Sequence, residues 1–238
     1  MTDWTSLRHA YGSADDLPGL LAAAEVDPND RHAWDALWGR LCHQGTVYSA
    51  SYTALPTLAT MATRRPVAGY VEPLHLAASI VASNDGPEGF DAIQRDYSEE
   101  LQILRDLAEQ SLRLAGGFIE FVYGLQALMA FEGLPPWNRE LQALADEELT
   151  VECTDCAEYL TIAIAEPPAT TAAIDDDLPV TAVTPADPLQ LRDTTARIYS
   201  LALQHGQTMA VDRLPYLFGT TTCPACGISI NLPQALTT

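Results

Sequence analysis

The sequence contains no lysine. All 12 of its basic residues are arginines, against 32 aspartates and glutamates, which gives a formal net charge of −20 at pH 7. A chain with this balance repels the phosphates of nucleic acids and of anionic membranes. We therefore expect neither nucleic acid nor a membrane as a partner, and the charge favours a basic protein instead.

Signals for export and membrane insertion are also missing. The N-terminus has no basic region followed by an apolar run, so no signal peptide is expected. The most apolar stretch, residues 115–133, is interrupted by Glu120 and Glu132, and we interpret it as a buried helix. These features predict a cytoplasmic protein.

The sequence shows no catalytic motif. No glycine-rich phosphate loop follows a strand, and no Gly-x-Ser-x-Gly turn is present. Glu72 and His75 have the i, i+3 spacing of di-iron bundles but lack the second copy that such sites require. Cys42, beside His43, is interpreted as a buried structural thiol, because adjacent residues on a helix point apart. We predict that the chain is not an enzyme; the alternative is an active site assembled from residues distant in the sequence.

Cysteine is scarce, but four of the five cysteines form two Cys-x-x-Cys pairs, Cys153 with Cys156 and Cys223 with Cys226. Two such pairs are typical of a structural zinc site, because a tight turn directs both sulfurs of each pair at one tetrahedral ion. Short strands expected around both pairs give the pattern of a zinc ribbon. The alternatives are a redox pair, which belongs between a strand and a helix, disulfides, which suit a secreted chain, and unrelated buried thiols. We predict one structural Zn²⁺ bound by all four cysteines.

The rest of the pattern is mainly helical. Asp30 is placed to cap a helix and Thr46 to cap the next one. Apolar residues after Asp30 recur at helical spacing, as in Trp34, Leu37, Trp38 and Leu41. Because the expected helices come in pairs joined by short turns, the sequence predicts a HEAT-like solenoid of helical hairpins with a small zinc-ribbon-like β element.

The predicted domains follow from this pattern. A helical repeat domain covers residues 1–148, and the zinc-ribbon-like element covers 149–238. Within that element, residues 166–188 contain five prolines and the run Asp175–Asp177, which predicts an irregular linker. A pair of helices is expected over residues 189–218.

One long amphipathic helix is predicted over residues 91–115. Its apolar side carries Tyr97, Leu101, Leu104, Ala108 and Leu112. Its acidic side carries Asp96, Glu99, Asp106 and Glu109. Such a side is most often solvated, and the alternative is a surface on which a basic partner docks. These four acidic residues are therefore the candidate partner-binding residues.

A family resemblance lies within residues 34–58. The run Trp-x-x-Leu-Trp-x-x-Leu-Cys-His-Gln-Gly-Thr-Val-Tyr-x-Ala-Ser is followed by Ala54-Leu55-Pro56-x-Leu58. This pattern resembles a group of bacterial HEAT-like repeat proteins, some of which look like immunity proteins of toxin systems. The resemblance implies an immunity protein that occludes a cognate toxin, such as a basic nuclease. The alternative is an adaptor or regulatory scaffold in a larger complex.

Overall fold

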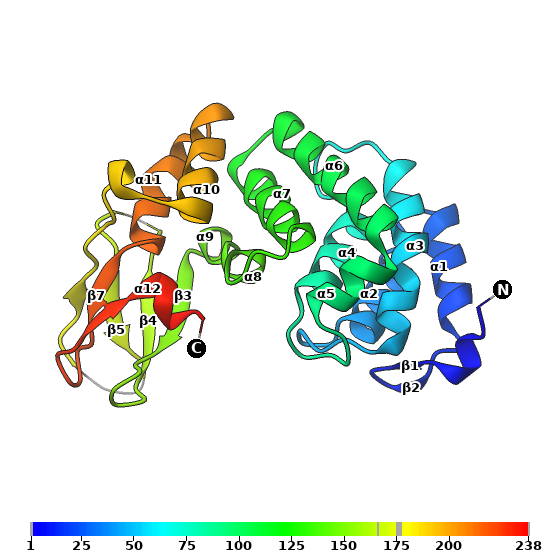
Figure 1. The fold of residues 1–238 in the computed structure, drawn as a ribbon, viewed down its shortest axis with the longest axis horizontal. Coiled ribbons are helices and arrows are strands. Elements are labelled where there is room, and N and C mark those ends of the chain that lie inside the picture. The colour runs from blue at the N-terminus through cyan, green and yellow to red at the C-terminus, as the bar shows by residue number, and fades with distance from the viewer. Residues whose placement is uncertain (1, 166, 175–177, 238) are drawn as a thin grey trace. The chain divides into compact units, whose positions relative to one another are not determined.

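The computed structural model describes residues 2–165, 167–174 and 178–237. The fold is mainly helical, with small antiparallel sheets (Figure 1). The chain divides into two compact units, the first made of Met1–Leu114 with Ala127–Gly133 and the second of Ala115–Gln126 with Leu134–Thr238. The second unit thus begins before the domain boundary predicted at residue 148. None of the described helices is both long and apolar enough to cross a bilayer.

The first unit contains a short hairpin and a set of packed helices. It begins with η1 (Trp4–Ser6), β1 (Arg8–His9) and β2 (Gly12–Ser13). Helices α1 (Leu17–Val26) and α2 (Arg31–Leu41) pack against each other, as do α3 (Ser49–Thr63) and α4 (Glu72–Ala82). Next come α5 (Phe90–Asp96) and α6 (Ser98–Leu114), and α6 packs against α3 and α4.

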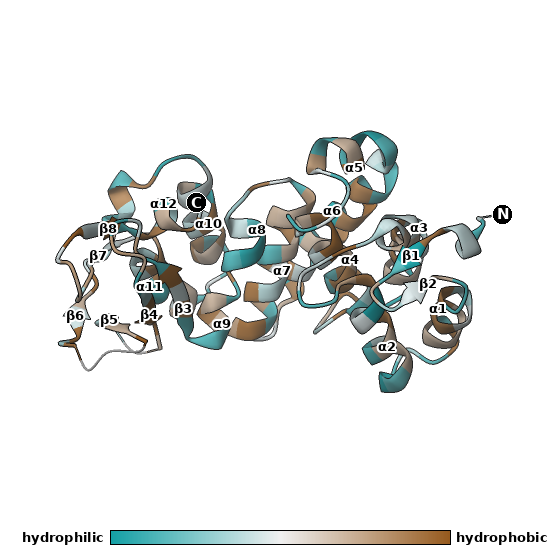
Figure 2. Ribbon diagram, turned by 90° about the horizontal axis from the view of Figure 1, so that it is seen from below, coloured by the Kyte–Doolittle hydropathy of each residue, from teal (hydrophilic) through white to brown (hydrophobic). Residues whose placement is uncertain are grey.

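Helix α2 forms where the apolar spacing predicts it, with Trp34, Leu37 and Leu41 buried. The Asp30 side chain accepts a hydrogen bond from the Ala33 amide at 3.0 Å, which confirms the predicted cap of α2. Figure 2 shows hydrophilic and hydrophobic residues alternating around the helices, as expected for helices that bury one side. The largest fully buried side chains of the unit include Leu17, Leu37, Leu41, Leu55, Leu58, Met61, Leu74, Leu76, Ile80, Ile93 and Leu104.

Two predicted helix boundaries are wrong. Thr46 does not cap α3, because its hydroxyl donates to Asp85 at 2.6 Å, and α3 begins only after Tyr48. The long helix predicted over residues 91–115 is two helices, because Tyr97 leaves helical geometry between α5 and α6. The sequence carries a reason for this break: Ser98 is followed by acidic residues, which favour the first turn of a new helix.

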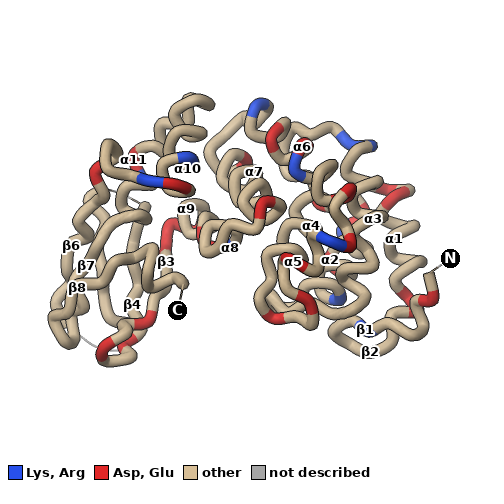
Figure 3. The backbone as a smooth tube through the Cα atoms, viewed as in Figure 1, with Lys and Arg blue, Asp and Glu red and all other residues tan. Residues whose placement is uncertain are grey.

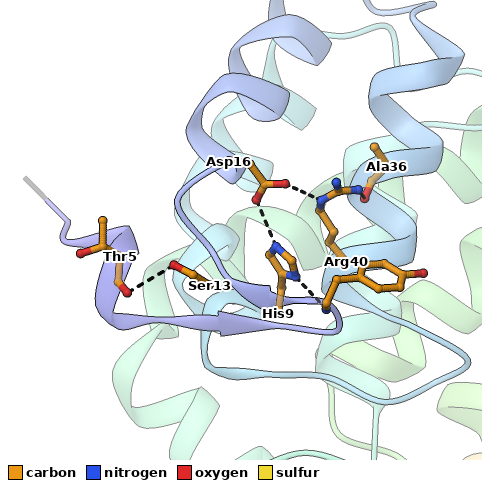
Figure 4. Close-up of polar contacts among 7 residues, drawn as sticks. Thr5, His9, Ser13, Asp16, Ala36 and Arg40 are labelled. Atoms are coloured by element: carbon orange, nitrogen blue, oxygen red, sulfur yellow. Dashed lines mark hydrogen bonds and ion pairs between the residues drawn. The ribbon is translucent and has the colours of Figure 1, made fainter.

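A buried histidine ties the N-terminal hairpin to α1 and α2 (Figure 4). The Nδ1 of His9 accepts the Tyr11 amide at 2.9 Å, so Nε2 carries the proton that is donated to Asp16 at 3.1 Å. The second carboxylate oxygen of Asp16 accepts from Nε of Arg40 at 2.7 Å. Both ring nitrogens of His9 are therefore hydrogen-bonded, and the network joins the hairpin to the start of α1 and to α2.

The second unit combines helices with two small sheets. It holds the first part of α7 (Phe118–Phe131), α8 (Trp137–Glu140) and α9 (Ala143–Asp146). Strands β3 (Glu148–Glu152), β4 (Tyr159–Ala163), β5 (Thr170–Ala173) and β6 (Thr181–Ala182) form an antiparallel sheet in that order. After η2 (Pro188–Gln190), α10 (Asp193–Gln204) and α11 (Thr208–Leu217), strands β7 (Thr220–Thr222) and β8 (Ser229–Asn231) form a hairpin that leads into α12 (Leu232–Ala235).

The helix pair predicted at residues 189–218 is confirmed by α10 and α11, whereas the irregular linker predicted at 166–188 is wrong. That segment supplies β5, which extends the sheet from β4, and β6. Ala169 and Thr171 are buried there. The run Asp175–Asp177, on which the prediction partly rested, lies outside the described residues. Deleting residues 170–173 would therefore remove a strand.

Candidate metal centre

The first cysteine pair occupies the turn between β3 and β4. Cys153 follows β3 directly, and its amide donates to the carbonyl of Glu158 at 2.8 Å. The amide of Ala157 donates back to the Cys153 carbonyl at 2.9 Å. Ala157 closes this turn with a φ of 59°, in the left-handed region. The turn therefore holds Cys153 and Cys156 on one side of the hairpin end.

The second pair repeats this geometry between β7 and β8. The Cys223 amide donates to the Ile228 carbonyl at 2.8 Å, and the Gly227 amide donates to the Cys223 carbonyl at 2.9 Å. Gly227 has a φ of 78°, which glycine adopts without the steric cost of a side chain. The two turns are thus equivalent, although glycine in one stands where alanine stands in the other.

The four sulfur atoms form one cluster, as the sequence predicts. The Sγ atoms of Cys153 and Cys226 lie 3.7 Å apart, those of Cys156 and Cys223 lie 3.8 Å apart, and all four lie within 4.8 Å of one another. A zinc–sulfur bond of about 2.3 Å in a tetrahedron separates the sulfurs by about 3.8 Å. A disulfide would bring two sulfurs to about 2 Å. The spacing therefore fits four ligands of one metal ion, and all five cysteines are free thiols.

Burial and protonation differ among the four thiols. Cys153 and Cys223 are buried, whereas Cys156 and Cys226 are exposed. Burial raises the pKa of Cys153, but hydrogen bonds from the backbone amides of Cys156 and Asp155 outweigh it and bring the pKa to about 7. For Cys226 the Ile228 amide lowers the pKa, while desolvation and the neighbouring thiols raise it to about 12. Crowded thiols resist carrying several negative charges at once, and a bound cation removes that obstacle.

Hydrogen bonds connect the segment between the two cysteine pairs to β7. Thr171 of β5 and Thr221 of β7 place their Oγ1 atoms 2.6 Å apart, and both residues are buried. The Thr181 hydroxyl donates to the Thr222 carbonyl at 2.7 Å. Thr184 and Thr220 exchange backbone hydrogen bonds of 2.8 and 2.9 Å. The segment between the two cysteine pairs is therefore part of the frame that aligns them.

One buried arginine that the sequence analysis missed supports this frame. The Arg213 guanidinium, on α11, donates to the carbonyls of Leu144 at 3.2 Å and Ala165 at 2.6 Å and to the Glu147 carboxylate at 2.9 Å. It also lies 5.2 Å from the centre of the Phe118 ring. A signal was present in the sequence, because Arg213 falls on the same helical stripe as the buried residues Ala210, Leu214 and Leu217.

The four candidate partner-binding acids do not form one continuous helical face. Asp96 belongs to α5, while Glu99, Asp106 and Glu109 belong to α6. Asp96 pairs with Nε of its neighbour Arg95 at 3.1 Å, and Asp106 accepts from Gln102 at 2.7 Å. Asp96, Glu99 and Asp106 are exposed and Glu109 is half-buried.

Other groups considered as metal ligands are engaged elsewhere. Glu72 accepts from the indole nitrogen of Trp38 at 2.9 Å, and His75 is buried against the ring of Tyr70. Burial raises the pKa of Cys42, in keeping with an unreactive thiol. In the part of the chain that the structure describes, the four-cysteine cluster is the one group of His, Cys, Asp and Glu side chains close enough to share an ion. No protein-family model, curated protein or solved structure that was compared with the chain matches it.

Proposed function

We propose that Cys153, Cys156, Cys223 and Cys226 bind one zinc ion, so that the two hairpins act as a zinc-ribbon-like element. The sulfur separations of 3.7 and 3.8 Å support this proposal. Four thiolates fill a tetrahedral shell and leave no position for water or substrate, so the ion has a structural role. When bound, it supplies a cross-link between hairpins that lie far apart in the sequence.

The function that we propose for the whole chain is binding of a basic protein. The observation that carries this proposal is the formal charge of −20, reached without a single lysine. Such a charge attracts basic proteins over long distances and repels nucleic acids and anionic membranes. A HEAT-like arrangement of the helices would suit this role, because stacked helical hairpins offer an extended binding surface.

Within this class, we favour an immunity protein that occludes a cognate toxin. The support is the resemblance of residues 34–58 to HEAT-like repeat proteins, together with the acidic charge, which suits a toxin whose active site binds phosphates. A second candidate is an adaptor or regulatory scaffold in a larger complex, with the metal element as its docking unit. The exposed position of Cys156 and Cys226 at the hairpin ends favours this second candidate.

The test begins with capture of the partner from the native host on the immobilised chain. Association kinetics with the captured protein are then measured at two salt concentrations. We expect fast association at low salt that slows steeply with ionic strength, because the Debye length falls from about 30 Å at 0.01 M to about 8 Å at 0.15 M. Salt-insensitive association would contradict the proposal.

Expression of the captured protein then separates the two candidates. An immunity protein should restore growth to cells that the captured protein poisons. An adaptor should instead be found bound to a partner that is harmless when expressed alone. A captured partner with a net negative charge would contradict both versions of the proposal.

A further inference from the structure

The sheet of the second unit has one buried face and one open face. Its strands alternate, so that Leu149, Val151, Leu160 and Ile162 point to the buried side. On the opposite side, Glu148, Thr150 and Glu152 of β3 are exposed, as are Tyr159 and Ala163 of β4. The open face continues to Ile174, which comes directly after β5. The Ile174 amide donates to the Tyr159 carbonyl at 3.0 Å.

Carboxylates and apolar side chains stand side by side on this open face. Glu152 is directly opposite Tyr159 in the antiparallel register, and Glu148 is opposite Ala163. Tyr159 is 54% exposed and Ile174 is 51% exposed, so both leave apolar surface in water. The positions between them are threonines and alanines, whose small side chains leave room for another chain to lie across the strands.

The charges of this face are unbalanced. Among the described residues, neither Glu148 nor Glu152 has a side-chain hydrogen bond or ion pair, whereas Asp96 pairs with Arg95 and Asp106 with Gln102. No arginine occurs between Arg139 and Arg192. Figure 3 shows acidic residues on β3 and the turn that follows it, and no charged residue on the β7–β8 hairpin. The acidic character is therefore concentrated on the strand beside Tyr159.

These features fit one kind of occupant. A second copy of the chain would bring its own carboxylates against Glu148 and Glu152, and nucleic acids or anionic lipids would be repelled in the same way. Guanidinium or ammonium groups bind carboxylates, and an apolar side chain gains from covering exposed apolar surface. The matching surface therefore carries arginine or lysine beside aliphatic or aromatic residues.

We propose that the open face of β3, β4 and β5 is the docking surface for a basic, partly apolar segment of a partner protein. Cations of the partner contact Glu148 and Glu152, and an apolar side chain packs against Tyr159 and Ile174. This inference rests on the proposed basic partner and adds the place of contact, which differs from the acidic side of α6.

The test uses the full chain and two synthetic peptides as probes, one with arginine alternating with leucine and one with glutamine in place of arginine. Binding is measured by titration at low and at physiological salt. We expect saturable binding of the arginine peptide, and binding of the glutamine peptide that is weaker by about tenfold or more. Amide chemical-shift changes should map to residues 148–152, 159–163 and 170–174.

Matched charge reversals then locate the site. The variant Glu148→Lys/Glu152→Lys should bind the arginine peptide about tenfold or more weakly, whereas Glu99→Lys/Asp106→Lys, with the same change in net charge, should lose only a few-fold through the long-range field. The variant Tyr159→Ser/Ile174→Ser should lose affinity at both salt concentrations, because the apolar contact is not screened. Circular dichroism and metal content establish that each variant is folded; Glu152→Gln replaces the double reversal if that variant does not fold.

The remaining outcomes separate the two levels of the proposal. If the α6 reversal weakens binding and the sheet reversal does not, the proposed docking surface is wrong, whereas the proposal of a basic partner is not contradicted. If both reversals weaken binding equally, or the shifts spread over every acidic surface, the attraction is unspecific and the docking surface is wrong. If the arginine peptide does not bind at low salt, both the docking surface and the proposed basic partner are contradicted.

Discussion

Cys153 and Cys226 belong to different hairpins, and their sulfur atoms lie 3.7 Å apart. The chain between these two residues includes β4, β5, β6 and the helix pair α10–α11. An ion bound by both cysteines therefore closes a long loop, and such closure stabilises a fold largely by restricting the unfolded chain. The cysteine cluster and the strands that align it therefore depend on each other.

We predict one zinc ion per chain, lost on treatment with a strong chelator. Because the thiols must lose their protons to bind the metal, the apparent affinity should fall as the pH is lowered. Metal content measured by mass spectrometry, before and after chelation, checks the stoichiometry. Chelation should also increase hydrogen exchange in β3, β4, β7 and β8. Absence of metal from protein purified without chelators would contradict the site.

Replacing Cys226 by Ser should loosen the second unit and leave the first unit intact. The variant loses one of four ligands, so the two hairpins are no longer held together by a complete metal site. Hydrogen exchange should rise in β7, β8 and α12, with little change in α1–α4. The matched control is Cys42→Ser, which removes the thiol outside the cluster and should retain the metal. Equal loss of protection in both units of the Cys226 variant would show that the metal does not act locally.

The hydroxyl pair of Thr171 and Thr221 gives a prediction about the frame. Thr171→Val should lower the free energy of unfolding by about 1–3 kcal/mol, because the buried Thr221 hydroxyl loses its partner. The double variant Thr171→Val/Thr221→Val should be no less stable than the single variant, since no buried hydroxyl is then left unpaired. Urea unfolding of the four proteins in this cycle measures both effects. Additive losses would indicate that the two hydroxyls do not interact.

Strand β5, which carries Thr171, shows why part of the fold could not be predicted from the sequence. Each cysteine pair is a local pattern, and the need of zinc for four ligands joins the two pairs, so the cluster could be predicted from the sequence. Strand β5 is short and lies among prolines, and its composition indicated a linker. It is stabilised by pairing with β4 and by the bond from Thr171 to Thr221, which is distant in the sequence. Contacts of this kind leave no periodic pattern.

Helix boundaries and buried charged residues are a second class of features that the sequence did not predict. Apolar spacing predicted the buried stripe of α2, because side chains on one side of a helix recur with its period. The same spacing ran through Tyr97 without interruption, so the break between α5 and α6 was visible only in the polar residues that follow. Arg213 was missed because its partners are carbonyl groups, which every residue carries.

The network of His9, Asp16 and Arg40 should make the first unit sensitive to acid. Burial alone would raise the pKa of Asp16, but the hydrogen bonds from Arg40 and His9, together with the charge of Arg40, lower it below the ordinary value of 3.8. A carboxyl whose folded pKa is lowered stabilises the fold above its unfolded pKa and loses that contribution as the pH falls through the folded pKa. The stability of the wild type should therefore decline below about pH 4 more steeply than that of Asp16→Asn. Urea unfolding at several pH values tests this, with Asp15→Asn as the control for loss of a neighbouring charge.

Arg213 should be a sensitive position of the second unit. The residue is 7% exposed, and its guanidinium satisfies the carbonyls of Leu144 and Ala165. Arg213→Met fills a similar volume but leaves these carbonyls without a donor, so we expect a loss of about 2–3 kcal/mol in the free energy of unfolding. The side chain of Glu147 is 53% exposed and can be hydrated, so loss of its ion pair should add little to the loss of stability.

Two further variants separate the geometry of Arg213 from its charge. Arg213→Lys keeps the charge but cannot direct several donors at fixed angles, so its stability should lie between those of the wild type and Arg213→Met. Arg192→Met, at an exposed position before α10, removes the same charge and should change stability by less than about 0.5 kcal/mol. If Arg213→Met is as stable as Arg192→Met, the guanidinium does not support the frame. If Arg213→Lys matches the wild type, charge alone is sufficient, and the directed hydrogen bonds are not what stabilises this unit.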